Sequence, residues 1–164
     1  MNIEVTVIND SHIVGYLASV FREGEIYMKD VSSMVSNVLS ALRAASRTCS
    51  VASAQYVHQL SRLNILDHGN PSGIQIGADW VDATTLPTFA PTLSRLAGHF
   101  SSIGFVHLQH CQVGQNQALM TGLAKTFGVS VYAGTGSQNP VYRFNFGDYV
   151  RADPNGNYAK AGRP

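Results

Sequence analysis

The chain has little charge. Only 13% of its 164 residues are Asp, Glu, Lys or Arg, about half the roughly 25% that is usual in soluble proteins. A surface so poor in charge is compatible with burial in a protein partner or a homo-oligomer, although the many Ser, Thr, Asn and Gln residues can also solvate it. Basic and acidic residues nearly balance, with a net charge of +1. The sequence therefore predicts no nucleic-acid and no membrane partner.

Cysteines and long apolar runs are also scarce. Cys49 and Cys111 are the two cysteines, too few for a disulfide framework in a chain of this length, and they fit a reducing compartment without excluding one bridge. No apolar stretch is long enough to span a bilayer. The N-terminus lacks the basic and apolar regions of a secretory leader. We expect a cytoplasmic protein, or one exported without a signal peptide.

Strand and helix patterns alternate along the chain. Short apolar runs predict strands at residues 3–8, 63–67, 103–109 and 129–133. Apolar residues at helical spacing predict helices after Asp30, through 89–100 and over 114–127. This order is typical of an α/β three-layer sandwich, with a mostly parallel sheet and helices on both faces.

The apolar fraction of 45% is ordinary for a single core. We expect one domain over residues 1–152 and a flexible tail rich in Gly, Asn and Pro over 153–164. The alternating aromatic residues from Tyr142 to Phe146 predict a late strand whose rings pack in the core.

Two predicted strands end at reactive side chains. The run that includes Leu63 and Leu66 leads into Asp67, His68 and Gly69, and the run from 103 to 109 leads into His110 and Cys111. An open α/β sheet places its working groups at the carboxyl ends of its strands. An imidazole and a thiol in such positions indicate a thiol nucleophile with a proton-transfer partner.

Each of these residues also has an ordinary structural explanation. Cys111 could be a buried cysteine that acts as a small apolar residue, and His68 could cap its strand and bond a turn. The functional interpretation rests on their joint occurrence. A helix N-terminus after Cys111 would stabilise a thiolate, and Gly69 leaves its N–H open to an oxyanion, with the N–H of Cys111 as a second donor.

The other histidines near Cys111 do not predict a metal site. His107 and Cys111 share one strand face, whereas His110 opposes them if the strand continues. A structural zinc site usually draws four ligands at looped spacings. We expect no metal and no cofactor. Asp79, Asp82 and Asp148 are candidates for binding a basic side chain of a substrate.

The two strand ends resemble a known family. The segments Leu66-Asp67-His68-Gly69-Asn70-Pro71-Ser72-Gly73 and Gln109-His110-Cys111-Gln112-Val113-Gly114 are similar to the caspase/gingipain-like (clan CD) cysteine peptidases. They are closer to a bacterial domain found in large surface adhesins. The resemblance continues to Ala133-Gly134-Thr135 and covers roughly residues 63–135.

The resemblance implies a caspase-like fold and a cysteine-dependent hydrolase, an endopeptidase with a narrow protein or peptide substrate. In this scheme Cys111 attacks an acyl carbonyl and His68 transfers the proton, while Gly69, Gln109, Gly134 and Thr135 bind the substrate or its oxyanion. His110 stands where the peptidases usually have a small residue, and the chain is short for a full peptidase. A non-catalytic protein-interaction module that retains the caspase-like fold is therefore the alternative.

Overall fold

The computed structural model describes residues 2–9, 26–48, 58–139, 142 and 144–164. The strands of its main sheet are β1 (Asn2–Asn9), β2 (Ile26–Met28), β3 (Gln59–Leu66), β7 (Phe100–Gln109), β8 (Ser130–Gly134), β11 (Tyr149–Ala152) and β12 (Tyr158–Ala161). A small sheet contains β4 (Gly69–Asn70), β5 (Gly73–Ile76) and β6 (Asp79–Asp82), and a hairpin contains β9 (Gln138–Asn139) and β10 (Phe144–Asn145). The helices are α2 (Val31–Thr48), α3 (Leu86–Leu93) and α4 (Gln117–Phe127), with the 3-10 turns η1 (Ser94–His99) and η2 (Val113–Gln115).

The main sheet is mostly parallel. Among the described residues its strand order is β12-β11-β8-β7-β3-β1-β2. Every neighbouring pair from β2 to β8 is parallel, whereas β11 and β12 run antiparallel at one edge. The prediction of an α/β protein with a mostly parallel sheet is confirmed at this level.

Helix α2 forms where the sequence places it. The carboxylate of Asp30 accepts the N–H of Ser33 at 2.6 Å, and the hydroxyl of Ser33 accepts the N–H of Asp30 at 3.0 Å. This reciprocal cap satisfies backbone donors that the first turn leaves free. The apolar residues at helical spacing all face the core: Val31, Met34, Val35, Val38, Leu39 and Leu42.

Helix α4 begins later than the sequence predicts. Residues Val113–Gln115 form a 3-10 turn, and the helix starts after Asn116, whose side chain accepts the N–H of Leu119 at 3.0 Å. Gly128 ends the helix with a positive φ of 69°, a conformation that favours glycine. The predicted helix over 89–100 is shifted too, because α3 spans Leu86–Leu93 and a 3-10 turn follows it.

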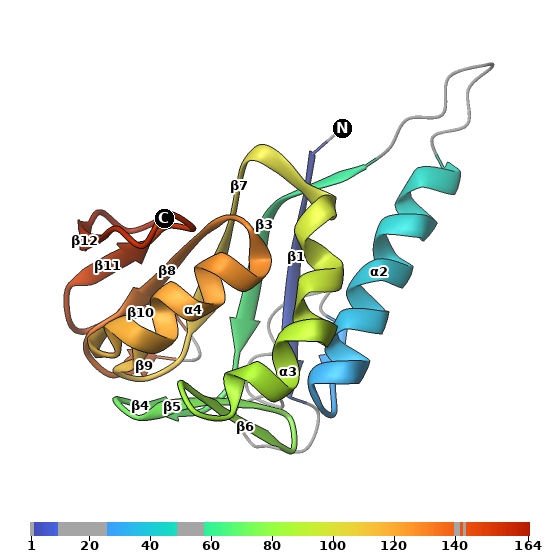
Figure 1. Cartoon of the computed structure of the whole chain (residues 1–164). Helices are drawn as coiled ribbons and strands as arrows, with labels where there is room; N and C mark the ends of the chain where they lie inside the picture. The colour runs from blue at the N-terminus through green and yellow to red at the C-terminus, as the bar shows by residue number, and fades with distance from the viewer. Residues whose placement is uncertain (1, 10–25, 49–57, 140–141, 143) are drawn as a thin grey trace.

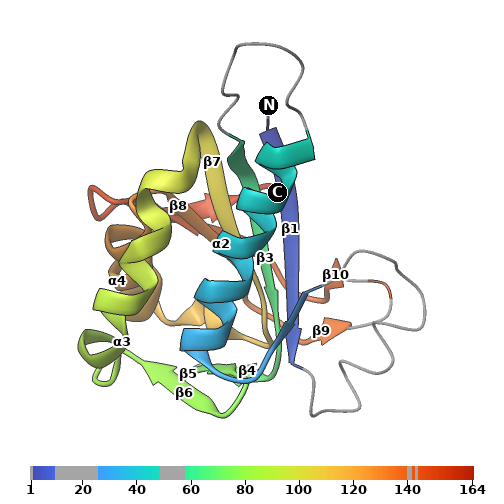
Figure 2. The ribbon, with the colours of Figure 1, turned by 90° about the vertical axis from the view of Figure 1, so that its right-hand side faces the viewer.

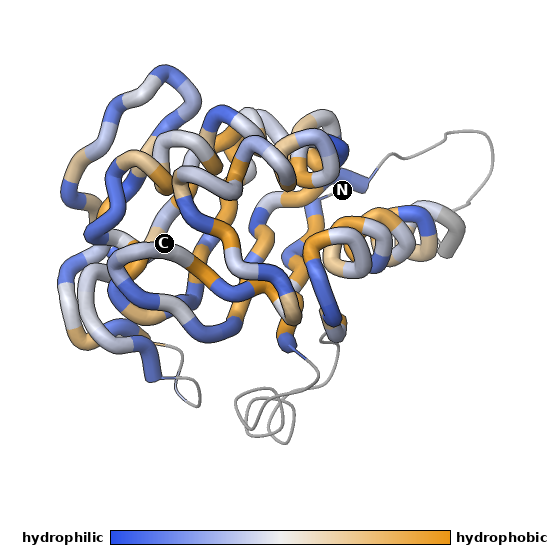
Figure 3. The backbone as a smooth tube through the Cα atoms, turned by 60° about the horizontal axis from the view of Figure 1, so that its bottom comes forward, coloured by the Kyte–Doolittle hydropathy of each residue, from blue (hydrophilic) through white to orange (hydrophobic). Residues whose placement is uncertain are grey.

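All three helices of the described residues lie on one face of the sheet (Figures 1 and 2). Alternate strand residues such as Val7, Ile65 and Leu108 join them in one core, and Figure 3 shows apolar stretches along the central strands. The sequence predicts helices on both faces, but the described residues carry none on the second face. The residues that point there include the polar Thr6 and Asn64 as well as Ile8 and Leu66, which form a second, small buried apolar cluster.

Two further differences concern the C-terminal part. Residues 153–164, predicted as a flexible tail, contain β12, which pairs with β11 from Tyr149↔Ala161 to Ala152↔Tyr158. Tyr158 packs against the core and its hydroxyl donates to the carbonyl of Gly114. The aromatic residues from 142 to 146 do not fill the core, because Phe146 is 69% exposed. No helix in the described residues is long and apolar enough to cross a membrane.

The small sheet β4–β6 lies at the carboxyl end of the main sheet, where the strands β1 and β3 end in Figure 1. The chain leaves β3, forms these three short strands and then enters α3. The hairpin β9–β10 lies at the same end, on the side of the sheet away from the helices (Figure 2). These two insertions surround the residues that follow β3 and β7.

Candidate functional site

The two strands with reactive ends are neighbours. β3 and β7 pair in parallel, and Leu66 at the end of β3 aligns with Gln109 at the end of β7. Asp67 and His68 therefore leave the sheet beside His110 and Cys111. His68 and Cys111 thus follow adjacent strands at the same end of the sheet.

Gly69 is where these two segments meet. A Cβ atom added at Gly69 would lie 2.7 Å from the Cβ of His110 and 3.3 Å from the carbonyl oxygen of Cys111. Ordinary carbon–carbon contacts are about 3.5–4.0 Å, so only glycine fits without a shift. His110 and Cys111 take up the space that a side chain at Gly69 would need, so the segment after His68 lies close to the end of β7.

The hairpin pairing orients the N–H of Gly69. The N–H of Gln75 donates to the carbonyl of His68 at 2.9 Å, which makes His68 and Gln75 a hydrogen-bonded pair. Antiparallel pairs alternate between bonded and non-bonded positions, and Gly69 pairs with Ile74 next. The N–H of Gly69 therefore points away from β5, as a donor to an external oxyanion must.

Cys111 lies between the end of β7 and the loop after β8. Its half-buried thiol accepts the N–H of Gln138 at 3.2 Å. The next residue, Gln112, has a left-handed φ of 59° and donates its N–H to the carbonyl of Gly136 at 2.8 Å. The helix that the sequence places directly after Cys111 starts only at Gln117. Within the described residues, the backbone N–H of Gln138 in β9 donates to the sulfur.

His68 has a fixed backbone and an exposed side chain. Its N–H donates to the carboxylate of Asp67 at 2.7 Å, and its carbonyl accepts the N–H of Gln75. The second carboxylate oxygen of Asp67 accepts the N–H of Gly77 at 2.9 Å. Asp67 is thus committed to backbone donors at the base of the small sheet, and it supports the segment that carries His68.

The remaining predicted site residues have different surroundings. Gly134 and Thr135 follow β8 next to the Cys111 loop, and the N–H and hydroxyl of Thr135 both donate to the carbonyl of Asp148. A Cβ at Gly134 would lie 2.0 Å from the side chain of Asn145. Gln109 is buried within the sheet, on the face opposite α2, α3 and α4. It is in a polar network rather than beside Gly69.

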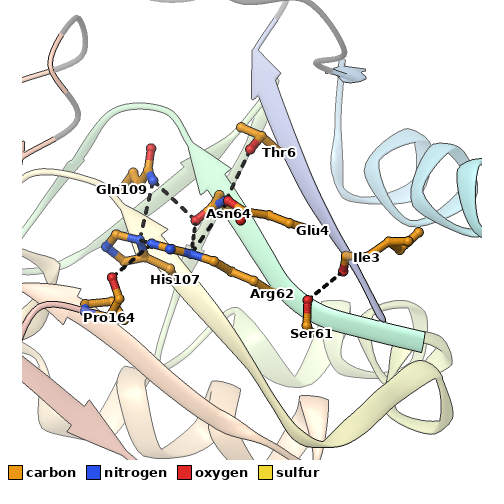
Figure 4. A network of polar contacts seen from close by, with 9 residues as sticks. All are labelled: Ile3, Glu4, Thr6, Ser61, Arg62, Asn64, His107, Gln109 and Pro164. Atoms are coloured by element: carbon orange, nitrogen blue, oxygen red, sulfur yellow. Dashed lines mark hydrogen bonds and ion pairs between the residues drawn. The ribbon is translucent and has the colours of Figure 1, made fainter. Parts of the chain in front are cut away.

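This network was not found from the sequence (Figure 4). Arg62 donates to the carbonyl oxygen of the Asn64 side chain at 2.9 Å and to Nδ1 of His107 at 2.9 Å. The amide nitrogen of Gln109 donates to the same two acceptors, at 3.3 and 3.4 Å. The amide of Asn64 donates to Glu4 at 2.7 Å. Polar residues at alternate positions of β3 and β7, in matching register, could have indicated it.

His107 is neutral in this network. Burial lowers the pKa of His107 to about 3, and the positive charge of Arg62 adds to the effect. Because two donors point at Nδ1, the hydrogen of the neutral ring is on Nε2. Within the described residues, buried Nε2 of His107 and Oε1 of Gln109 have no hydrogen-bond partner. The described residues contain no group of three His, Cys, Asp or Glu that could hold a metal ion.

The three aspartates proposed for a basic substrate side chain have partners in the chain. Asp79 accepts the N–H of Val31 at 3.0 Å, at the start of α2. The carboxylate of Asp82 accepts hydrogen bonds from the following turn, chiefly from the hydroxyl of Thr84, which lower its pKa to about 2. Asp148 forms an exposed ion pair with Lys160 at 2.9 Å. Asp79 and Asp82 therefore have structural roles.

Comparison with known proteins gives one family. No curated protein matches the chain. Residues 25–139 match the family model described as a domain of unknown function, DUF4347. The matched region runs from β2 to β9 and includes both strand ends and the small sheet. Since it covers well over half of the residues, the chain belongs to the DUF4347 family.

Proposed function

We propose that the chain is a cysteine-dependent hydrolase of caspase-like fold, an endopeptidase with Cys111 as nucleophile and His68 as its proton-transfer partner. The observation that carries the proposal is the contact at Gly69. It brings the segment after His68 against the backbone of Cys111. An imidazole or a thiol at a strand end is common by itself. A glycine position at which an added Cβ would crowd both His110 and Cys111 supports one site.

In the proposed reaction, His68 takes the proton of the Cys111 thiol and the sulfur attacks the peptide carbonyl carbon. The carbonyl oxygen becomes an oxyanion beside the N–H groups of Gly69 and Cys111. His68 then gives its proton to the leaving amine, and the C–N bond breaks to leave an acyl-enzyme. Water hydrolyses the thioester and restores the thiol. Each oxyanion donor typically contributes about 3 kcal/mol to the barrier.

The support for the caspase-like part is topological. The proposed His and Cys follow adjacent parallel strands at the centre of a mostly parallel sheet. Open α/β sheets bind their ligands at the carboxyl ends of such strands. The loop with Gly134 and Thr135 follows the next strand along, β8, and we propose that it forms one wall of the substrate cleft.

Covalent labelling tests the proposal. A peptide with an acyl electrophile should modify Cys111 much faster than Cys49, which lies outside the described residues and serves as an internal reference. Cys111→Ala should remove the fast label. His68→Ala should slow it by about 100-fold or more, the usual contribution of a positioned acid or base. Equal labelling of the two cysteines, together with no effect of His68→Ala, would end the proposal.

A second candidate is a non-catalytic module that binds a protein. It is favoured by the aromatic side chains of the segment after β9: Tyr142 is 72% and Phe146 is 69% exposed. Exposed aromatic residues are enriched at protein interfaces. For a binding module, Cys111→Ala would leave partner binding unchanged and Phe146→Ala would weaken it. For the hydrolase, Cys111→Ala would abolish product formation.

A further inference from the structure

His110 is a buried histidine that the proposed reaction does not use. Its Nε2 lies 2.9 Å from the carbonyl oxygen of Gln75. A carbonyl only accepts, so Nε2 carries the hydrogen and Nδ1 of the neutral ring does not. Nδ1 is buried and has no hydrogen-bond partner within the described part of the chain. A half-satisfied imidazole in a core is costly, so the single bond to Gln75 needs an explanation.

Asp67 makes this bond available. In a regular antiparallel pair, the N–H of His68 would donate to the carbonyl of Gln75. Here the N–H of His68 donates to the carboxylate of Asp67 at 2.7 Å. The carbonyl of Gln75 is then open to His110, while the N–H of Gln75 still donates to the carbonyl of His68. Gln75 therefore bonds both segments, one ending at His68 and the other at Cys111.

We propose that His110 is a positioning residue, which holds Cys111 beside His68 through its bond to the carbonyl of Gln75. This inference rests on the proposed function of Cys111 and His68. The bond draws the end of β7 toward β5, and the contact between Gly69 and the Cβ of His110 stops it. An attraction and a steric stop on the same residue define its place, and Cys111 is the next residue along the chain.

The electrostatic environment of His110 suits a positioning role. Burial lowers the pKa of His110 to about 4, and a positive His68 lowers it further, although the bond to Gln75 and the negative Asp67 oppose this effect. His110 is therefore neutral at pH 7. Its Nε2–H then stays directed at Gln75 whether His68 is protonated or not, so the position of Cys111 is constant through the proton transfers of the reaction.

Two polar variants distinguish the effect of the hydrogen bond to Gln75 from the effect of the volume that the His110 side chain fills. In His110→Gln the amide nitrogen reaches the place of Nε2, whereas in His110→Asn the side chain is one carbon shorter and cannot reach Gln75. His110→Phe fills the volume without a donor, and it serves if the shorter variant does not fold. We would measure the rate at which iodoacetamide alkylates Cys111, across the pH range in which histidine and cysteine titrate. Hydrogen exchange of the Gln75 amide would be measured in parallel.

We expect His110→Gln to keep the wild-type pH profile and a rate within about twofold. His110→Asn and His110→Phe should lose the inflection that His68→Ala removes and react about tenfold to 100-fold more slowly, the cost of a misplacement near 1 Å. The Gln75 amide should exchange faster in both. A folded His110→Asn or His110→Phe with the wild-type profile would overturn the inference, and so would a folded His110→Gln that is as slow as these.

Failure of the proposed function can be told apart from failure of this inference. If His68→Ala keeps the wild-type profile, Cys111 has no partner in His68, and the tie between the strand ends is then judged by exchange alone. Faster exchange of the Gln75 amide in His110→Phe would still support that tie, and unchanged protection would refute it.

Discussion

The close approach at Gly69 gives a sharp prediction for Gly69→Ala. The new methyl group would lie 2.7 Å from the Cβ of His110, 3.2 Å from the carbonyl oxygen of Gly73 and 3.3 Å from that of Cys111. Two of these neighbours are backbone atoms, and the third is the Cβ of His110, whose ring is buried and bonded to Gln75. None of them is the free end of a flexible side chain. The strand ends must therefore separate by close to 1 Å.

Overpacking of this kind usually costs 1–3 kcal/mol, so we expect a loss of about 2 kcal/mol in the free energy of unfolding. For a chain of this size that is a fall of roughly 4–8 °C in Tm. The same displacement moves Cys111 from His68. We therefore expect the alkylation rate of Cys111 to fall by more than the loss of stability alone explains, by about tenfold or more.

Gly98→Ala is the matched control. A Cβ at Gly98 meets no atom within 4 Å, and alanine there should be neutral or slightly stabilising. Thermal unfolding and iodoacetamide labelling of both variants give the comparison. If Gly69→Ala has the same Tm as Gly98→Ala and Cys111 reacts at the wild-type rate, the two strand ends are not crowded at Gly69, and the main support for the proposed site is lost.

Three other predictions concern the supports of the site. Gly134→Ala would push a Cβ to 2.0 Å from Asn145 and should cost about 2–3 kcal/mol in urea unfolding; wild-type stability would contradict this packing. Asn116→Ala removes the acceptor for the N–H of Leu119 and the donor to the carbonyls of Pro71 and Ser72, and it should cost about 1–2 kcal/mol. Asn116→Ser keeps an uncharged capping oxygen and should lose less stability; equal losses in the two variants would show that the cap is not the cause. The lowered pKa of His107, about 3, means that the unfolded chain binds a proton below its ordinary value of about 6.5 while the folded chain does not. Stability is therefore complete above that value and falls toward acid pH by up to about 1.4 kcal/mol per pH unit from this group. His107→Asn should remove that part of the slope in unfolding measured at two pH values, and an unchanged slope would refute it.

Much of the architecture could be predicted from the sequence because the apolar residues that face the core recur at regular spacing. The apolar residues of α2 recur at helical spacing after Asp30, and the structure buries them all. The order of strands and helices predicted the parallel sheet. The second face of the sheet was harder to predict, because the buried polar residues Asn64, His107 and Gln109 are stabilised by one another. Several of these bonds join β3 to β7, so a one-dimensional pattern does not show them.

The strand β12 was missed for a related reason. Gly, Asn and Pro after Asp153 are typical of a mobile end, but here they form a turn. The carboxylate of Asp153 accepts the N–H groups of Asn155 and Asn157 at 2.9 and 3.1 Å. That turn returns the chain so that β12 pairs with β11. The composition of a turn and that of a loose tail are the same, and only the strand that follows distinguishes them.

At the candidate site, too, the sequence indicates some residues and misses the role of others. Each strand end carries two successive polar residues, Asp67 with His68 and His110 with Cys111, of which the first is buried and the second more exposed. The sequence indicated the chemistry of the outer pair, because thiol and imidazole have few other uses together. The sequence did not give the inner pair a role. Asp67 accepts the N–H of Gly77, and His110 bonds the carbonyl of Gln75. Both partners lie in a hairpin that the local pattern around Cys111 does not show. Substitution should therefore separate the pairs. Changes at His68 or Cys111 should alter reactivity with little effect on stability, because these side chains are more exposed. Changes at Asp67 or His110 should alter both, because a buried polar residue fixes the geometry that the outer residues need.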